Sequence, residues 1–277
     1  MDTTPLPVSA RFRHIIAALL FLLPSLVGRT HAQVNAEALA AAARDSGWTL
    51  DARASLSMLQ GNIDVVDIGG GMQLRYSDRM SSASDAPFHN RLLLLADARR
   101  NTVQSRRIVN TAFFHARYTR MLRDRFGIDA FAQWQQDDAR RLVQRHIVGA
   151  GVRVDVLREK GVQAWTGGGY MLEWNELAAL PGGGSERTME QRWTQYVSVR
   201  YIHPATAAIF ETTAYIQPRL DRPTDARMLV EALAEVPLFG AVVMGARFGL
   251  THDTAPPDGV VATDYRLAHT LRVRIAW

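Results

Sequence analysis

The histidines and serines are the residues with which this chain could carry out nucleophilic or acid–base chemistry. The sequence contains eight histidines, and none begins the His-Glu-x-x-His pattern of a zinc protease. A lipid hydrolase would need a serine beside a histidine on the same face. Residue alternation places His115 and Ser198 on a polar face, and it leaves His146 and His269 on the apolar face without a serine. We therefore expect no catalytic residues and keep a lipid-modifying enzyme as an alternative.

Charged residues at every second position offer another chemistry, the selection of ions or solutes in a water-filled interior. The charged candidates for such an interior are Arg75, Asp97, Arg107, Arg153, Asp155, Glu211, Arg227, Glu231, Arg247, Asp264, Arg266 and Arg272. Arginines outnumber acids on this face, which predicts a preference for anions if water passes. The alternative is a closed interior filled by arginine–carboxylate pairs.

Side chains in this pattern must be positioned by β-strands, because only strands turn successive residues to opposite faces. The segment 264–277 is the clearest, with apolar residues on one parity apart from His269, and Asp264 with three arginines on the other. The same period predicts an all-β chain of about twelve antiparallel strands. The expected strands are 48–58, 66–77, 88–98, 107–118, 128–135, 148–156, 162–174, 193–201, 208–218, 226–238, 242–250 and 264–277.

Strands of this kind form either a transmembrane β-barrel with its apolar face outward or a soluble barrel with that face inward. The segments are longer than ordinary strands and reach the length that a tilted membrane strand needs. The face opposite the apolar one is rich in charges, as a polar lumen would be. Aromatic residues such as Trp48, Trp134 and Trp193 collect near strand ends, as in interfacial girdles. We therefore predict a transmembrane barrel and retain a soluble periplasmic binding barrel as an alternative.

The N-terminal residues have the composition of a secretory signal. Arg11 and Arg13 precede an apolar run that is too short to span a membrane, and small residues at Thr30 and Ala32 suit a peptidase site. The predicted organisation is a cleaved signal peptide at 1–32, a short periplasmic segment at 33–46 and a barrel at 47–277. An even number of strands would place both termini in the periplasm and the loop 177–190, expected to be the longest, outside.

The amino-acid composition limits which ligands and partners can be expected. The absence of cysteine excludes disulfides and cysteine metal sites, and it suits an oxidising compartment. The net charge of +5 is mild and interspersed with acids, so no nucleic-acid surface is expected. No motif indicates a metal or another cofactor, and the glycine triplets 69–71 and 167–169 suit bends or bulky neighbours rather than phosphate binding.

Two short segments resemble a known family. Tyr215-Ile216-Gln217-Pro218, followed by Asp225-Ala226-Arg227, resembles a "YxQP…DxR" pattern, and Thr251-His252-Asp253 lies downstream. Over 90–277 the chain is similar to the Domain of Unknown Function family 481, the salt-induced outer-membrane proteins. The resemblance implies an outer-membrane barrel with no established activity and a link to salt or osmotic stress.

Together these observations predict a structural or narrow-channel barrel in the outer membrane of a Gram-negative bacterium. Its expected surroundings are outer-membrane lipid and lipopolysaccharide, and small ions or solutes could pass through it. The barrel assembly machinery is the other expected partner, because the chain ends in alternate apolar residues and an aromatic: Leu271, Val273, Ile275 and Trp277.

Deletion of Trp277 should lower the assembled fraction of the protein in cells and leave signal cleavage intact, because the terminal aromatic anchors the last strand at the membrane boundary. The assembled form is measured as the band whose gel mobility changes on boiling. Trp277→Phe is the matched control and should assemble normally. Normal assembly of the deletion variant would mean that Trp277 is simply the end of the chain.

Overall fold

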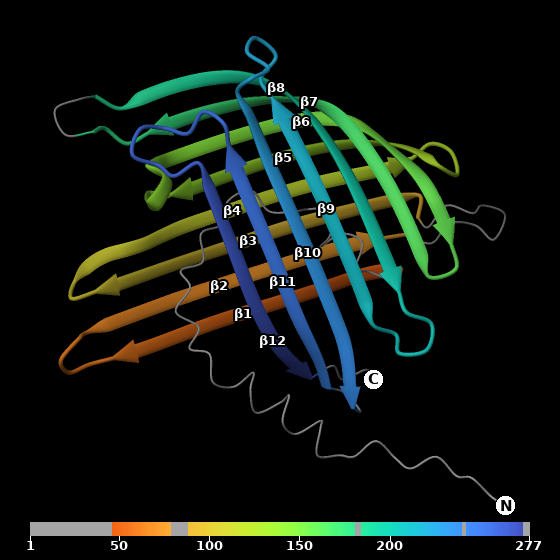
Figure 1. Cartoon of the computed structure of the whole chain (residues 1–277), viewed down its shortest axis with the longest axis horizontal. Coiled ribbons are helices and arrows are strands. Elements are labelled where there is room, and N and C mark those ends of the chain that lie inside the picture. The colour runs from red at the N-terminus through yellow and green to blue at the C-terminus, as the bar shows by residue number, and fades with distance from the viewer. Residues whose placement is uncertain (1–45, 79–87, 181–183, 240–241, 274–277) are drawn as a thin grey trace, which may run out of the picture.

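The protein is a single antiparallel sheet of twelve strands, curled into a barrel (Figure 1). The computed structural model describes residues 46–78, 88–180, 184–239 and 242–273. Each strand pairs with its neighbours in sequence order, from β1 to β12. The strands are β1 (Gly47–Leu59), β2 (Val65–Ser77), β3 (Asn90–Val103), β4 (Arg106–Met121), β5 (Phe126–Asp137), β6 (Leu142–Glu159), β7 (Val162–Leu177), β8 (Glu186–Ile202), β9 (Ile209–Pro218), β10 (Ala226–Phe239), β11 (Val242–Asp253) and β12 (Thr263–Val273).

All twelve predicted strands are confirmed, and the period-two pattern locates each of them. Several strands are longer than the pattern indicates. The β7–β8 hairpin continues to the pair Leu177↔Glu186, so the predicted loop 177–190 was too long. Backbone hydrogen bonds continue in this hairpin beyond the residues whose apolar side chains alternate. The connection between β2 and β3, at 78–89, is longer than the one between β7 and β8, at 178–185.

The strand connections define two ends of the barrel. The connections 138–141, 178–185, 219–225 and 254–262 lie at what we name the loop end. The connections 122–125, 160–161 and 203–208 lie at the opposite, turn end, where β1 begins and β12 ends. A short 3-10 helix, η1 (Asp138–Arg140), occupies the β5–β6 connection. Within the described ranges, no helix is long and apolar enough to cross a membrane.

The seam of the barrel lies between β1 and β12. Among the residues described, the ladder runs from β1 to β12 without a pair that joins the two. On the inner face of β1, the side chains of Asp51 and Arg53 are 62% and 63% exposed. Closure of the seam stays a prediction, since Ile275 and Trp277 lie outside the described residues. So do the predicted signal 1–32 and nearly all of the segment 33–46.

Glycines at the centre of the sheet leave room for large neighbours and for close backbones. A Cβ on Gly167 would lie 2.4 Å from the ring of Tyr196, and one on Gly149 would lie 2.4 Å from the ring of Phe131. A Cβ on Gly169 would meet the backbone oxygen of Ala150 at 2.3 Å. These glycines therefore accommodate bulky side chains and tight strand pairing, as the sequence predicted for the second triplet.

Gly169→Ala should destabilise the barrel by about 1–3 kcal/mol, because the new methyl group meets backbone that cannot turn aside. Urea titration of refolded protein in detergent measures the change. Gly70→Ala is the matched control from the first triplet. Its Cβ would meet nothing closer than the Arg53 oxygen at 3.6 Å, so its unfolding midpoint should stay close to that of the native protein. Equal effects of the two changes would contradict this account of the packing.

Candidate functional site: the barrel interior

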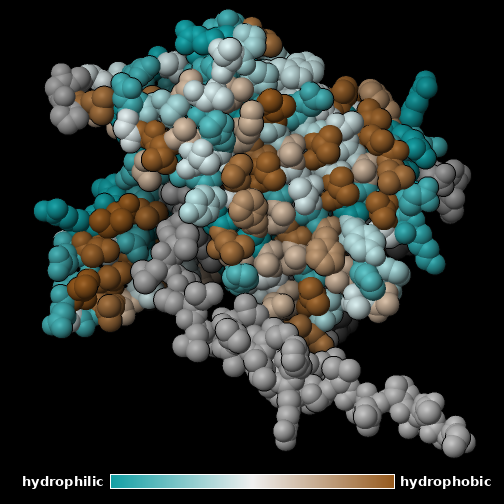
Figure 2. All heavy atoms as spheres, in the orientation of Figure 1, coloured by the Kyte–Doolittle hydropathy of each residue, from teal (hydrophilic) through white to brown (hydrophobic). Residues whose placement is uncertain are grey.

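The outer face of the sheet is apolar and exposed. Val152 on β6, Trp193 on β8 and Leu267 on β12 are 42%, 45% and 53% exposed, although each is large and apolar. Figure 2 shows apolar side chains spread over the strands that face the viewer, with hydrophilic side chains at the strand ends. The apolar face therefore points outward. This arrangement contradicts the alternative of a soluble barrel with an apolar interior.

The inner face carries most of the charged residues that the sequence placed there. Ten of the twelve candidates lie on the inward parity of their strands: Arg75, Asp97, Arg153, Asp155, Glu211, Arg227, Glu231, Arg247, Asp264 and Arg266. Arg107 does not, because the β3–β4 ladder shifts register beside Thr102. Its side chain is 53% exposed and lies 3.5 Å from Asp138 at the loop end. The backbone of Arg272 belongs to β12, and its side chain lies outside the description.

Sequence reasoning missed several charged residues of the interior. Asp137, Arg145, Glu190, Arg192 and Asp253 occupy strand ends beyond the predicted limits. The first strand adds both a carboxylate and an arginine to this face, in Asp51 and Arg53. With these residues included, acids and arginines are nearly balanced on the described part of the inner face, so the described residues do not show the expected excess of arginine. These residues were missed because the predicted strands were too short. Near the loop end the strands lack the alternating apolar residues from which strands are predicted.

Glu173 is the centre of the charged interior. Its side chain is fully buried, and Arg227 Nη1 donates to its two oxygens at 2.5 and 2.6 Å. Asn175 donates to the same carboxylate at 2.7 Å, and Arg145 Nε lies 3.3 Å away. Glu173 and Arg227 belong to β7 and β10, which are not neighbours in the sheet. Their ion pair therefore joins two strands of the wall that share no sheet hydrogen bonds.

A second arginine extends this network to the loop end. Arg192 is 1% exposed, and its Nη2 donates to Glu190 at 2.7 Å and to Asp225 at 2.9 Å. Its Nη1 also donates to the backbone oxygen of Gln217 at 3.0 Å. Asp225 and Gln217 belong to the "YxQP…DxR" pattern. Two residues of that pattern thus meet on one buried guanidinium group.

The remaining motif segments complete the loop end. Arg227 Nε donates to Asp253 at 3.0 Å. Arg140 of η1 forms an ion pair with Asp264 and donates to Thr251 Oγ1 at 3.1 Å, which ties β5 to the last two strands. At the rim, Arg219 donates to Asp221 at 2.6 Å, and this hydrogen bond lowers the pKa of the Asp221 carboxyl group below its ordinary value.

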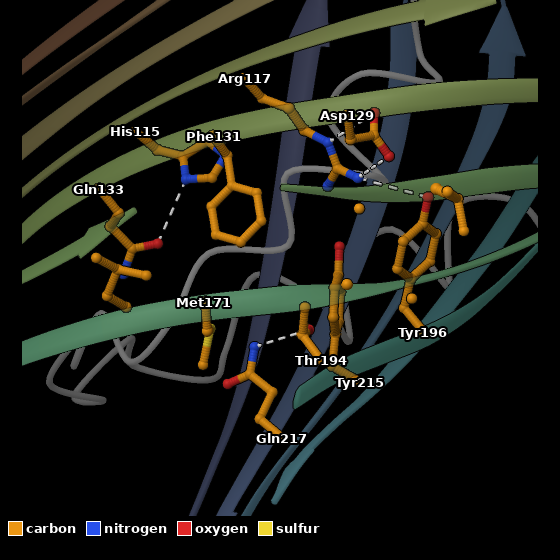
Figure 3. Close-up of a pocket in the computed structure, with 15 residues that line it drawn as sticks. His115, Arg117, Asp129, Phe131, Gln133, Met171, Thr194, Tyr196, Tyr215 and Gln217 are labelled. Atoms are coloured by element: carbon orange, nitrogen blue, oxygen red, sulfur yellow. Dashed lines mark hydrogen bonds and ion pairs between the residues drawn. The ribbon is translucent and has the colours of Figure 1, made fainter. Parts of the chain in front are cut away.

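The middle of the interior holds a small cavity (Figure 3). Arg117 donates to Asp129 at 2.8 Å and to the Tyr196 hydroxyl at 3.4 Å, and the ring of Tyr196 lies 5.3 Å from that of Tyr215. Phe131 and Met171 form part of the apolar lining in the same view. The cavity measures about 40 Å³, which is room for a few water molecules. The interior between β4 and β9 is therefore largely filled.

The interior near the turn end is also packed. Arg153 donates to Asp155 at 3.0 Å, and its guanidinium carbon lies 4.7 Å from the centre of the Trp165 ring. Ser198 is fully buried and shares a 2.7 Å hydrogen bond with Thr213. His115, in the middle layer, lies 3.3 Å from Gln133. Ser198 and His115 thus have separate inward partners and do not form a site on the lipid-facing surface.

Arg247 on β11 differs from the other inner-face arginines. It is half-buried, and within the described residues it makes no ion pair or hydrogen bond. Its partners across the ladder are Leu233 and Ala268, and Gly245 and Gly249 are its inward neighbours along β11. No carboxylate therefore stands directly opposite this cation. The inner side chains of β10 to β12 are less buried than those of β4 to β9.

An outward apolar face and a paired, charged interior define a β-barrel of membrane type. The family model for "Protein of unknown function, DUF481" matches residues 52–275, so the chain belongs to this family. No curated protein matches the chain. Among solved structures, one titled as the NanC porin in a rhombohedral crystal form is similar at 12% identity and a TM-score of 0.42. The match covers 82% of this chain and 99% of that one.

Glu173→Gln should destabilise the protein by about 3–5 kcal/mol, because it leaves the Arg145 charge without its carboxylate and removes one of the carboxylates paired with Arg227. Urea titration of detergent-refolded protein measures the loss. Glu176→Gln, on the same strand, is the matched control. Glu176 pairs with Arg187, whose side chain is 77% exposed, so its removal should leave the midpoint unchanged. A neutral Glu173→Gln variant would show that the network does not hold the walls together.

Proposed function

We propose that the protein is an outer-membrane β-barrel whose interior forms a narrow polar channel. The observation that carries the proposal is the distribution of side chains between the two faces. Exposed apolar residues such as Val152, Trp193 and Leu267 cover the outer face, and charges fill the inner one. Such a surface is costly in water and stable in lipid, where closed barrels satisfy every backbone group.

The orientation follows from the termini. Because β1 begins and β12 ends at the turn end, we assign that end to the periplasm and the loop end to the cell surface. The surface loops then meet lipopolysaccharide, and the exported chain is inserted by the barrel assembly machinery. The salt link implied by the family resemblance adds one expectation, that the amount of protein rises with external salt.

The packed interior favours a narrow channel over a wide pore. Side chains fill the space between β4 and β9. We therefore infer that a channel would run beside the less buried inner side chains of β10 to β12. Arg247 is one of these side chains and has no paired carboxylate among the residues described. A cation without a paired carboxylate in a narrow path attracts anions and repels cations. Anion preference is thus expected from Arg247 and not from an overall excess of arginine.

Val152→Arg tests the membrane location. It should cost about 2–4 kcal/mol if Val152 faces lipid near the midplane, because the new charge would lie in hydrocarbon. Met189→Arg is the matched control, since Met189 is also exposed and outward but lies near the loop end. That change should cost about 0–1 kcal/mol, as at a membrane boundary. Refolding titrations in lipid vesicles measure both. Recovery of the native protein as a soluble periplasmic species would overturn the proposal.

Arg247→Glu tests conduction. Planar-bilayer recordings of the native protein should show small steps with an anion preference, and the variant should shift the reversal potential toward cations. Arg187→Glu makes the same charge change on the exposed rim of β8 and should leave the preference unaltered. A native protein that never conducts would mean that arginine–carboxylate pairs close the interior and that the barrel is structural. Phospholipid hydrolysis by the native protein would instead support the enzyme alternative.

A further inference from the structure

A basic hollow lies at the turn end, where the β4–β5 turn meets the end of β6. It is lined by Arg123, Asp124, Arg125, Phe126 and Arg158. Three of its five residues are arginines, whose planar guanidinium groups match the oxygens of a phosphate. This hollow is separate from the channel interior and takes no part in the proposed conduction.

Two of the arginines hold the hollow in shape. Arg158 Nη2 donates to the backbone oxygen of Asp124 at 2.7 Å and to the Asp155 carboxylate at 2.5 Å. Arg125 Nη1 donates to the backbone oxygen of Val156 at 3.3 Å. These contacts fasten the β4–β5 turn to β6. Arg125 uses only one of the five N–H donors of its guanidinium group in this contact, so donors remain for a ligand.

The third arginine is available for binding. The Arg123 side chain is exposed and makes no hydrogen bond or ion pair within the part of the chain that the structure describes. The one carboxylate that lines the hollow belongs to Asp124. The hollow therefore carries a net positive charge, even with Arg158 paired to Asp155.

The surface next to the hollow is apolar. Phe126 is 38% exposed and pairs with Val154, and Leu122 and Val156 are 52% and 57% exposed. These side chains lie on the outer face, which faces lipid in the proposed function. Arginine at the water boundary above exposed apolar residues is the arrangement that a membrane lipid requires, with its headgroup in one zone and its chains in the other.

We propose that this hollow binds the phosphate of a phospholipid headgroup, with the acyl chains lying along Phe126 and Val156. The inference rests on the proposed function, because a membrane location places the hollow at the periplasmic boundary of the bilayer. Arg123 and Arg125 supply donors to the phosphate oxygens, and Arg158 fixes the turn from which they extend. Neither channel conduction nor the Glu173 network is needed for this binding.

Native mass spectrometry of the detergent-solubilised protein tests the site. Phosphatidylglycerol is added as the probe, and diacylglycerol with the same chains is the control that lacks a phosphate. Phosphatidylglycerol should form a defined one-to-one adduct, and diacylglycerol should not. Arg123→Gln should weaken the adduct at least about tenfold, because it removes a charge-assisted hydrogen bond. The Arg123 side chain makes no hydrogen bond or ion pair within the described residues, so folding should be unaffected. The heat-shifted gel band checks this.

The double variant Arg123→Gln/Arg125→Gln should abolish the adduct. The matched control is the double variant Arg187→Gln/Arg222→Gln, which removes the same charge at the loop end and should leave the adduct intact. Equal adducts with diacylglycerol, or an adduct that survives the Arg123 and Arg125 changes, would overturn the site. Full displacement by excess inorganic phosphate would also overturn it, by assigning the hollow to free phosphate. Conduction is recorded in a separate experiment. If the protein conducts but forms no adduct, the lipid site is refuted and the proposed channel function is not affected.

Discussion

The ion pair between Glu173 and Arg227 is the interaction on which the interior depends. A carboxylate excluded from water is costly unless cations and hydrogen-bond donors surround it, and Glu173 has Arg227, Arg145 and Asn175 around it. The pair joins β7 to β10, which are separated in the sheet. Sheet hydrogen bonds hold only neighbouring strands together, so contacts across the interior must fix how far apart the walls stand.

The same principle explains the family pattern. Gln217, Asp225 and Arg227 lie far from Arg192 and Glu173 in the sequence, yet they meet in one buried network. Asp253 and Asp264 join its edge through Arg227 and Arg140. Asp225 and Arg227 of the pattern thus belong to the ion pairs of the loop end, and Gln217 contributes a backbone oxygen. We therefore expect these residues to position the strands of the wall. The ion selectivity proposed for the channel depends on Arg247 instead.

The two faces of the sheet have different roles in the proposed function. In the proposed function the outer face binds lipid through ordinary apolar contact, and the turn-end hollow binds a headgroup. The inner face is closed on one side by paired charges and aromatic rings, such as Arg153 over Trp165. Its other side is less buried, and there Arg247 has Leu233 and Ala268 opposite it and Gly245 and Gly249 as its inward neighbours along β11. In the proposed channel, the packed strands set the width and Arg247 sets the charge preference.

The sequence by itself determined the strands and the faces, because the alternation of side chains in a strand is a local property that each segment displays. It placed Arg153 and Arg227 inward and Val152 and Leu267 outward. It failed for Arg107, where a register shift changes the parity, and for Arg192 and Glu190, which lie on strand ends without an apolar signal. Only the tertiary structure decided which charges pair. The partner of Glu173 lies more than fifty residues away, and curling the sheet brings the two together.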